Sequence, residues 1–148
     1  MLAKSLVREW MTSPVITVTP DTSISLAHKI MKDNGVRRLV VVDPEDYVKG
    51  IITIGDVREA SPSDAVTLSI WELNYLWAQL TVEKIMTSPV MTVQADEPIL
   101  NAAKLMLAKK VSGLPVVDAA GRVVGMLTES DIFRLVVSTI EEDQRANS

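Results

Sequence analysis

The 148-residue chain contains no cysteine and only one histidine, His28. Without cysteine it can form no disulfide and no thiolate zinc site, and it has no thiol nucleophile. With a single histidine, most metal sites and acid–base pairs that depend on this residue are excluded. The sequence also contains no P-loop and no dinucleotide-binding fingerprint. We therefore predict that the protein is not an enzyme, has no catalytic residues or metal site, and requires no cofactor.

Long apolar runs and an excess of basic charge are also missing, and aromatic residues make up only 4% of the chain. No apolar run approaches the roughly 20 residues of a membrane helix, and the N-terminus has no apolar core of signal-peptide length. Lysine and arginine number 15 against 19 aspartate and glutamate, which gives a net charge of −4. We expect a soluble cytoplasmic protein that binds neither membranes nor nucleic acid, although a local basic patch is compatible with this charge.

The strongest positive signal is an internal repeat. With a shift of 75 positions, residues 7–57 align without a gap to residues 82–132, and 22 of the 51 pairs are identical. Met-Thr-Ser-Pro-Val at Met11–Val15 recurs at Met86–Val90, and the triplet Val41–Asp43 recurs at Val116–Asp118. The chain therefore arose by duplication of one unit.

Each copy has the pattern β-α-β-β-α. β-Branched runs predict strands, and apolar residues at helical spacing predict one amphipathic helix per copy before a second helix that opens at Thr53 or Thr128. The predicted strands are 15–18, 39–42 and 48–53 in the first copy, and 90–93, 114–117 and 123–128 in the second. This order places the protein in the α/β (α+β) class, with two repeats packed sheet to sheet around a pseudo-twofold axis.

The ends of the first helix in each copy carry capping signals. Asp21 and Asp96 stand where a helix N-cap is expected, and Pro98 fits the first helical turn. Asn34-Gly35 predicts a left-handed cap at the C-terminal end of the first copy's helix. The second copy has Lys109-Lys110 at this point, so we expect the cap not to be repeated.

The predicted organisation has four parts: repeat 1 over residues 1–60, a linker with a helix over 61–81, repeat 2 over 82–140 and a C-terminal tail over 141–148. In the linker, Trp77 and Leu80 share one helical face, with Trp71 and Tyr75 beside it. Two interpretations of this aromatic helix stay open. It covers an exposed side of the repeats, or it also contributes to a subunit interface.

The most informative polar residues are kept in both copies where the last strand meets the last helix. They form Gly-x-x-Thr-x-x-Asp at Gly50–Asp56 and at Gly125–Asp131. One interpretation is structural, because Thr-x-x-Asp at a helix start resembles a capping box. The other is functional, because a hydroxyl and amides at a helix start suit a phosphate and a carboxylate can accept hydrogen bonds from both ribose hydroxyls.

The sequence resembles a tandem pair of CBS (cystathionine-β-synthase-type) domains, called a Bateman module. The resemblance rests on the repeated Met-Thr-Ser-Pro-Val segments, the strands ending in Val-Val-Asp, and the two Gly-x-x-Thr-x-x-Asp motifs, and it covers residues 7–138. The first copy departs from the family pattern with Val40 where the second has Pro115. The linker resembles that of stand-alone bacterial CBS-pair proteins associated with acetoin utilisation.

The resemblance implies a regulatory ligand of the adenosyl class, namely AMP, ADP or ATP, with S-adenosylmethionine and NAD as further candidates. It implies two clefts between the repeats, in which the closing Asp holds the ribose and the Thr approaches the phosphate. The implied ligand-binding residues are Val36, Arg37, Arg38, Thr53 and Asp56 in the first copy, Val111, Ser112, Thr128, Ser130 and Asp131 in the second, and Ala27 and Ala102 on the helices that close the pockets.

The two sets are not equivalent, because Arg37 and Arg38 correspond to Ser112 and Gly113. Guanidinium groups pair with phosphates, so the set with Thr53 and Asp56 is the better candidate for a phosphorylated ligand. The resemblance further implies a homodimer and a regulated protein partner that reads ligand occupancy as a conformational change. The alternative is a structural interaction module whose ligand clefts are vestigial.

Overall fold

The computed structural model describes residues 4–60 and 70–147, and the linker residues 61–69 lie outside this range. The chain forms two compact units. The first-repeat unit consists of Ile16–Val90, and the second-repeat unit combines Met1–Val15 with Met91–Ser148. The compact units therefore do not coincide with the sequence repeats, because the N-terminal segment belongs to the unit built from the second repeat.

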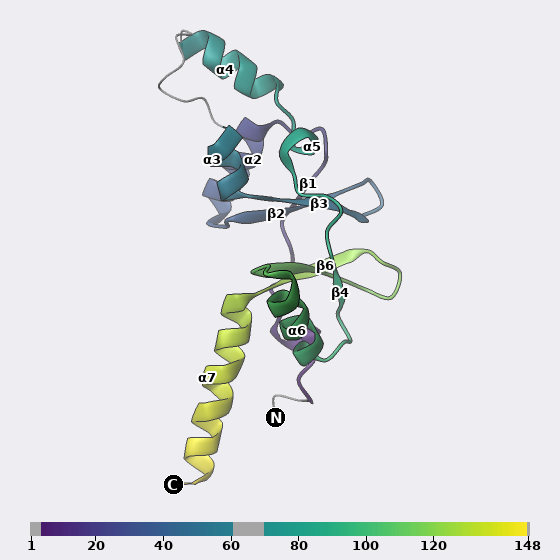
Figure 1. Ribbon diagram of the computed structural model, residues 1–148, viewed down its shortest axis with the longest axis vertical. Helices are drawn as coiled ribbons and strands as arrows, with labels where there is room; N and C mark the ends of the chain where they lie inside the picture. Colours follow the sequence, from purple (N-terminus) through teal and green to yellow (C-terminus); the bar gives the residue numbers. More distant parts are fainter. Residues whose placement is uncertain (1–3, 61–69, 148) are drawn as a thin grey trace. The chain divides into compact units, whose positions relative to one another are not determined.

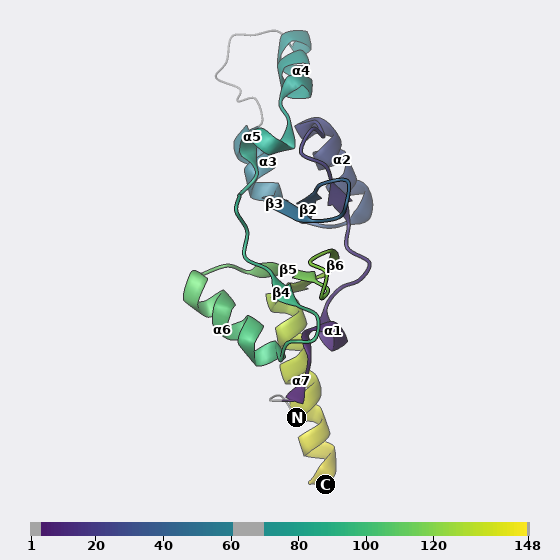
Figure 2. The same cartoon turned by 90° about the vertical axis from the view of Figure 1, so that its right-hand side faces the viewer.

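The first-repeat unit is a three-stranded sheet with helices on one face (Figures 1 and 2). Its elements are β1 (Thr17–Val18), α2 (Ile24–Asn34), β2 (Arg38–Val42), β3 (Val48–Thr53), α3 (Ile54–Ala60), α4 (Ile70–Gln79) and α5 (Val82–Ile85). The sheet order is β1-β2-β3, with β1 parallel and β3 antiparallel to the central β2.

The second-repeat unit repeats this topology. Its elements are α1 (Val7–Trp10), β4 (Val93–Gln94), α6 (Ile99–Lys109), β5 (Gly113–Val117), β6 (Val123–Thr128) and α7 (Glu129–Ala146). The sheet order is β4-β5-β6, again with one parallel and one antiparallel pair. The predicted β-α-β-β-α pattern and the mixed α/β class are confirmed. Residues 141–146 of the predicted C-terminal tail form the end of α7.

Each unit has its own hydrophobic core, built from the same repeat positions. In the first-repeat unit Ala27 and Met31 of α2 are buried against the strand residue Leu39, as helical spacing on one face requires. The short helices α1 and α5, which the sequence did not predict, supply Val7 to the second-repeat core and Val82 to the first-repeat core. Both valines have 0% of their surface exposed.

The repeated Met-Thr-Ser-Pro segments attach these short helices to the sheets. Thr12 exchanges two backbone hydrogen bonds with Met126 on β6, at 2.9 and 3.0 Å. Thr87 exchanges the equivalent pair with Ile51 on β3, at 2.9 and 3.0 Å. Each segment thus adds an antiparallel bridge to the edge of a sheet, which satisfies backbone groups that the edge would otherwise expose.

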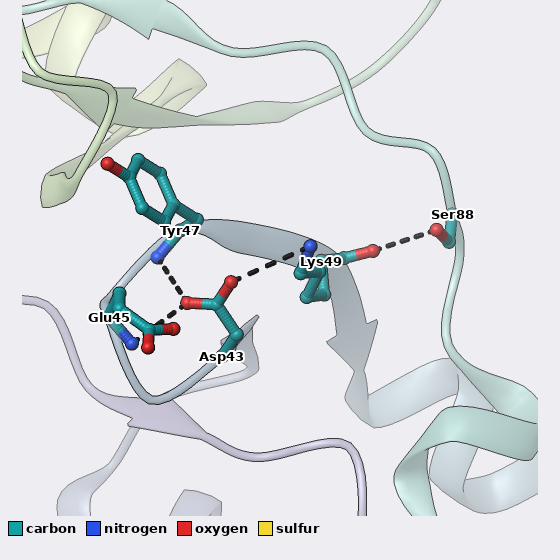
Figure 3. Close-up of polar contacts among 5 residues, drawn as sticks. All are labelled: Asp43, Glu45, Tyr47, Lys49 and Ser88. Atoms are coloured by element: carbon teal, nitrogen blue, oxygen red, sulfur yellow. Dashed lines mark hydrogen bonds and ion pairs between the residues drawn. The ribbon is translucent and has the colours of Figure 1, made fainter.

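The serine of each segment makes a further contact with the same strand. The Ser88 hydroxyl donates to the Lys49 carbonyl oxygen at 2.7 Å (Figure 3). The Ser13 hydroxyl donates to the Val124 carbonyl oxygen at 3.0 Å. The motif in one sequence repeat therefore holds the strand of the other repeat, and this exchange explains why the compact units differ from the sequence repeats.

The turn between β2 and β3 is organised by Asp43 (Figure 3). Its Oδ1 accepts the backbone N–H groups of Glu45 and Tyr47, both at 3.0 Å, and its Oδ2 lies 3.6 Å from Lys49 Nζ. Burial tends to raise the pKa of Asp43, but the two backbone hydrogen bonds and the nearby Lys49 ammonium outweigh it and lower this pKa from its ordinary value of 3.8.

The helix caps differ from the prediction in two ways. Ser23, not Asp21, is the N-cap of α2, and its hydroxyl accepts the Leu26 N–H at 3.2 Å. The N-cap of α6 is Pro98, so the caps predicted at Asp21 and Asp96 are wrong by two residues. Gly35 adopts the expected left-handed cap at φ 63°, but Lys110 adopts it too at φ 56°. The cap is therefore repeated without the glycine that lowers its cost.

The linker contains the predicted helix, α4. Trp77 and Leu80 pack against the first-repeat core, and the Trp77 ring lies 5.9 Å from the His28 ring on α2. Trp71 and Tyr75 remain 82% and 65% exposed. Among residues 4–60 and 70–147, no helix is long and apolar enough to cross a membrane.

Candidate functional site

The first junction, where β3 ends at Thr53 and α3 begins, holds Asp56 in a capping box. Asp56 Oδ2 accepts the Thr53 N–H at 2.8 Å, and Thr53 Oγ1 accepts the Asp56 N–H at 3.2 Å. These bonds satisfy backbone donors that a helix start otherwise leaves unpaired, so the structural interpretation of the motif is confirmed. They engage one carboxylate oxygen only. Within the described residues, no hydrogen bond or ion pair engages Asp56 Oδ1.

The second junction, where β6 ends at Thr128 and α7 begins, holds Asp131 in the same way with one addition. Asp131 Oδ2 accepts the Thr128 N–H at 2.8 Å and the Thr128 hydroxyl at 3.2 Å. The guanidinium of Arg134 forms an ion pair with Asp131 Oδ1. Asp131 is only 2% exposed, whereas Asp56 is half-buried.

The predicted residues before the central strands lie beside these junctions. Arg38 pairs with Thr53 across β2 and β3, and the Arg37 carbonyl oxygen accepts the Ile54 N–H at 2.8 Å. In the second-repeat unit the Ser112 carbonyl oxygen accepts the Glu129 N–H at 3.0 Å. The start of each central strand is thus bonded to the start of the last helix, so the Arg37 and Arg38 backbone lies next to the Thr53 cap.

A hollow of about 240 Å³ opens at the first junction. It is lined by Asp56, Glu59 and Ala60 of the α3 segment and by Ile85 of α5. Ligand pockets for whole drug-sized molecules start near 300 Å³, so this hollow suits part of a nucleotide, such as a ribose. The carboxylate with an unengaged oxygen and an open volume therefore occur together at the first junction.

A second hollow, of about 250 Å³, lies in the second-repeat unit between α6 and α7. Its lining is mostly apolar and consists of Ala103, Met106, Leu107, Val111, Glu129, Ile132 and Phe133. It contains one predicted site residue, Val111, but not Asp131 or Thr128. The predicted residues of the second set are therefore divided between the junction and this apolar hollow.

Two predicted residues do not reach a junction surface. Ala27 and Ala102 are 0% exposed and lie in the hydrophobic cores of their own units, so neither side chain offers a surface to a ligand. Val36 is half-buried and packs against the first-repeat core. Ser130, in the first turn of α7, is exposed.

The structure adds three residues that the sequence analysis did not select: Glu59 and Ile85 at the first junction, and Arg134 at the second. Glu59 and Arg134 occupy equivalent repeat positions with opposite charge, and this difference is the sequence signal that could have identified them. Within the described part of the chain, no group of three or more histidine, cysteine, aspartate or glutamate residues could hold a metal ion.

The sequence matches the CBS domain family over residues 7–63 and 82–138. A CBS domain-containing protein of Dictyostelium discoideum is 36% identical over 138 residues, which are 93% of this chain and 95% of that protein. An L-aspartate semialdehyde sulfurtransferase of Methanocaldococcus jannaschii is 35% identical over 131 residues, but this chain spans only 23% of its length. These relatives are eukaryotic and archaeal, and the resemblance to stand-alone bacterial CBS-pair proteins stays a prediction.

Solved structures of similar fold include CBS domain pairs with bound ligands. The CBS domain pair of protein MJ0100, in complex with 5′-methylthioadenosine and S-adenosyl-L-methionine, is 35% identical with a TM-score of 0.75, and the match covers 91% of this chain and 98% of that one. CBSX2 in complex with AMP is 27% identical with a TM-score of 0.73, and the match covers 90% and 97% of the two chains.

Proposed function

The chain belongs to the CBS domain family, and on this premise we propose that it is a non-catalytic regulatory module that binds an adenosyl ligand at its strand-to-helix junctions. The observation that carries the proposal is Asp56. Its Oδ2 completes a helix cap, its Oδ1 is not engaged within the described residues, and it lines the hollow of about 240 Å³. A carboxylate in this state can accept hydrogen bonds from a ribose diol.

The ligands of related structures support the adenosyl class. The CBS pair of MJ0100 holds 5′-methylthioadenosine and S-adenosyl-L-methionine, and CBSX2 holds AMP. All three ligands carry an adenosine ribose with two hydroxyls, which is the group that Asp56 would accept. AMP, ADP and ATP are the members of this class that we propose for the first junction.

The preference for a phosphorylated ligand rests on Arg37 and Arg38. Arg37 directly precedes β2 and Arg38 is its first residue, and the backbone of both lies beside the Thr53 cap of α3. Arg37 is exposed on the surface of the first-repeat unit. A guanidinium binds phosphate oxygens through two parallel hydrogen bonds, which lysine cannot match. We therefore assign the phosphate end of the ligand to this pair.

A thermal-shift panel tests the proposal. AMP, ADP, ATP, NAD, S-adenosylmethionine and adenosine are each added to the wild-type chain and to Asp56→Asn, with Asp33→Asn as the matched control. Asp33 is an exposed residue of α2 paired with Lys29 at 3.2 Å, outside both junctions. At least one nucleotide should raise the wild-type and Asp33→Asn melting temperatures, with a smaller rise for Asp56→Asn. No shift with any compound would contradict the proposal.

A second candidate function is that of a protein-interaction module, and the exposed face of α4 favours it. Trp71, Glu72, Tyr75 and Leu76 line a hollow of about 350 Å³ on this helix. Large exposed apolar side chains in a cluster mark interaction surfaces. Association of two copies, as a homodimer, and binding of a regulated partner are the two uses that we propose for such surfaces. Light scattering of the wild-type chain and of Trp71→Ser/Tyr75→Ser distinguishes the two uses. With no partner protein present, the wild-type chain should have a larger mass than the double variant only if this surface forms a homodimer.

A further inference from the structure

The two junctions differ in one charged residue of the helix that follows. Three positions after the closing aspartate, α3 has Glu59 and α7 has Arg134. Arg134 forms an ion pair with Asp131 Oδ1 inside the second-repeat unit. At the first junction the equivalent Glu59 lines the hollow together with Asp56 and carries the same charge as that residue. At equivalent backbone positions, the Asp131 carboxylate is therefore paired with a cation, whereas the Asp56 carboxylate has no cationic partner within the described residues.

The consequence follows from counting acceptor positions. A carboxylate has about four lone-pair positions on its two oxygens. Asp131 gives two positions on Oδ2 to Thr128 and engages Oδ1 with Arg134. Asp56 gives one position on Oδ2 to Thr53. A ribose diol can bind Asp56 through its three remaining positions. At Asp131 both Oδ2 positions are filled, so the two hydroxyls can bind only to the two positions of Oδ1, and the Arg134 guanidinium must then be displaced.

We propose that Arg134 is a specificity-determining residue that closes the second junction to the ribose diol, and that Glu59 keeps the first junction open. This inference rests on the proposed function of the junctions. The Arg134 side chain is 61% exposed, so its bond to the buried Asp131 carries only part of the strength of a fully buried ion pair. The guanidinium is therefore a competitor that a ligand can displace at a cost, and the two junctions have different affinities for the same nucleotide.

The test compares AMP with 2′,3′-dideoxy-AMP, which lacks the diol, by calorimetric titration. In an Asp56→Asn background, Arg134→Gln removes the competing charge but keeps an amide that can donate to Asp131. AMP should then bind roughly three- to tenfold more tightly, as expected for loss of a partly exposed ion pair, while the dideoxy compound should change little. The converse variant, Glu59→Arg in an Asp131→Asn background, should weaken AMP by a similar factor.

Three outcomes are informative. A gain for AMP alone on Arg134→Gln, including binding that appears only in that variant, supports the inference. Equal changes for AMP and the dideoxy compound, or none, overturn it, because a purely structural role of Arg134 would not depend on the diol. If the wild-type chain binds none of the adenosyl compounds, the proposed function itself fails. Because Glu59 is exposed, Glu59→Arg decides the matter even if the Arg134→Gln variant does not fold.

Discussion

Gly50→Ala should destabilise the first-repeat unit strongly, because the Met-Thr-Ser-Pro segment lies directly against this glycine. A Cβ at residue 50 would lie 2.6 Å from Met86 Sδ and 2.8 Å from the Thr87 carbonyl oxygen. The methionine end can rotate away, but the Thr87 oxygen is fixed by its backbone hydrogen bond from Ile51 at 3.0 Å. The strand or the segment must therefore shift.

The magnitude follows from two costs. Forcing an extra methyl group into a packed site costs about 1–3 kcal/mol. If the segment shifts instead, the two hydrogen bonds between Ile51 and Thr87 weaken, and each is worth about 1 kcal/mol. Both routes give a loss of about 1–3 kcal/mol in the free energy of unfolding. Gly125→Ala should cost the second-repeat unit a similar amount, since its Cβ would lie 2.6 Å from Met11 Sδ.

Urea denaturation measures the loss, and hydrogen exchange with mass spectrometry assigns it to a unit. Gly55→Ala is the matched control, because among the described residues its Cβ would meet only Thr53 Oγ1, at an ordinary 3.5 Å. That residue lies in α3, where alanine is about 1 kcal/mol more favourable than glycine. The same substitution should therefore stabilise at residue 55 and destabilise at residue 50. A loss below about 0.5 kcal/mol for Gly50→Ala, the size of an ordinary surface change, would show that the segment is not packed there.

Three further predictions concern the units, an acid-sensitive turn and the helix caps. Val7→Ala should lower the free energy of unfolding of the second-repeat unit by about 2 kcal/mol, and Val82→Ala should do the same in the first-repeat unit, because each valine is fully buried there. Hydrogen exchange that assigns either loss to the other unit would contradict the exchange of segments between the sequence repeats. Because the folded pKa of Asp43 lies below 3.8, this residue contributes stability that is present above that pH and is lost as the pH falls through the folded value. When the free energy of unfolding is measured against pH, the acid-induced loss should be smaller for Asp43→Asn than for wild type. Identical curves for the two proteins would contradict the lowered pKa. In thermal unfolding, Gly35→Ala should cost about 1 kcal/mol and Lys110→Gly should gain about as much, because both residues have left-handed backbone; a loss for Lys110→Gly would contradict the cap.

The repeat made most of the fold predictable. Identity at 75-residue spacing, β-branched runs and helical periodicity together fixed the β-α-β-β-α pattern of both copies, because these signals depend on local sequence. The strands predicted at 39–42 and 123–128, for example, agree with β2 and β6 to within one residue. The start of the last helix at Thr53 and Thr128 also agreed, since the capping box is a local motif.

The exchange of segments between units could not be predicted in this way. Val7 and Val82 lie in helices of four residues, which are too short to show periodicity. The other buried residues of their cores are distant in sequence, at positions 93–135 for Val7 and 18–57 for Val82. The wrong N-caps at Asp21 and Asp96 have a local cause, because three polar residues precede α2 and any of them can cap. The left-handed Lys110 shows that repeat packing imposes a conformation that its own sequence does not favour.

For the candidate site, the sequence identified the polar residues but not which atoms are open. Thr53, Asp56, Thr128 and Asp131 were predicted and lie at the two junctions as expected from their spacing. Ala27 and Ala102 were selected only as small residues, and burial in the cores leaves them no surface. The ion pair of Arg134 escaped prediction because most surface charges make no specific contact, and only the structure shows that this one reaches a buried carboxylate.

Calorimetric titration of AMP into the wild-type chain, Asp56→Asn and Asp131→Asn tests the central claim most directly. The account predicts saturable binding to wild type, a marked loss of affinity in Asp56→Asn, and little change in Asp131→Asn. Of the two junction carboxylates, Asp56 is the one with an oxygen unengaged within the described residues and with an open volume beside it. Heats of dilution alone for wild type, or equal affinities for wild type and Asp56→Asn, would contradict it.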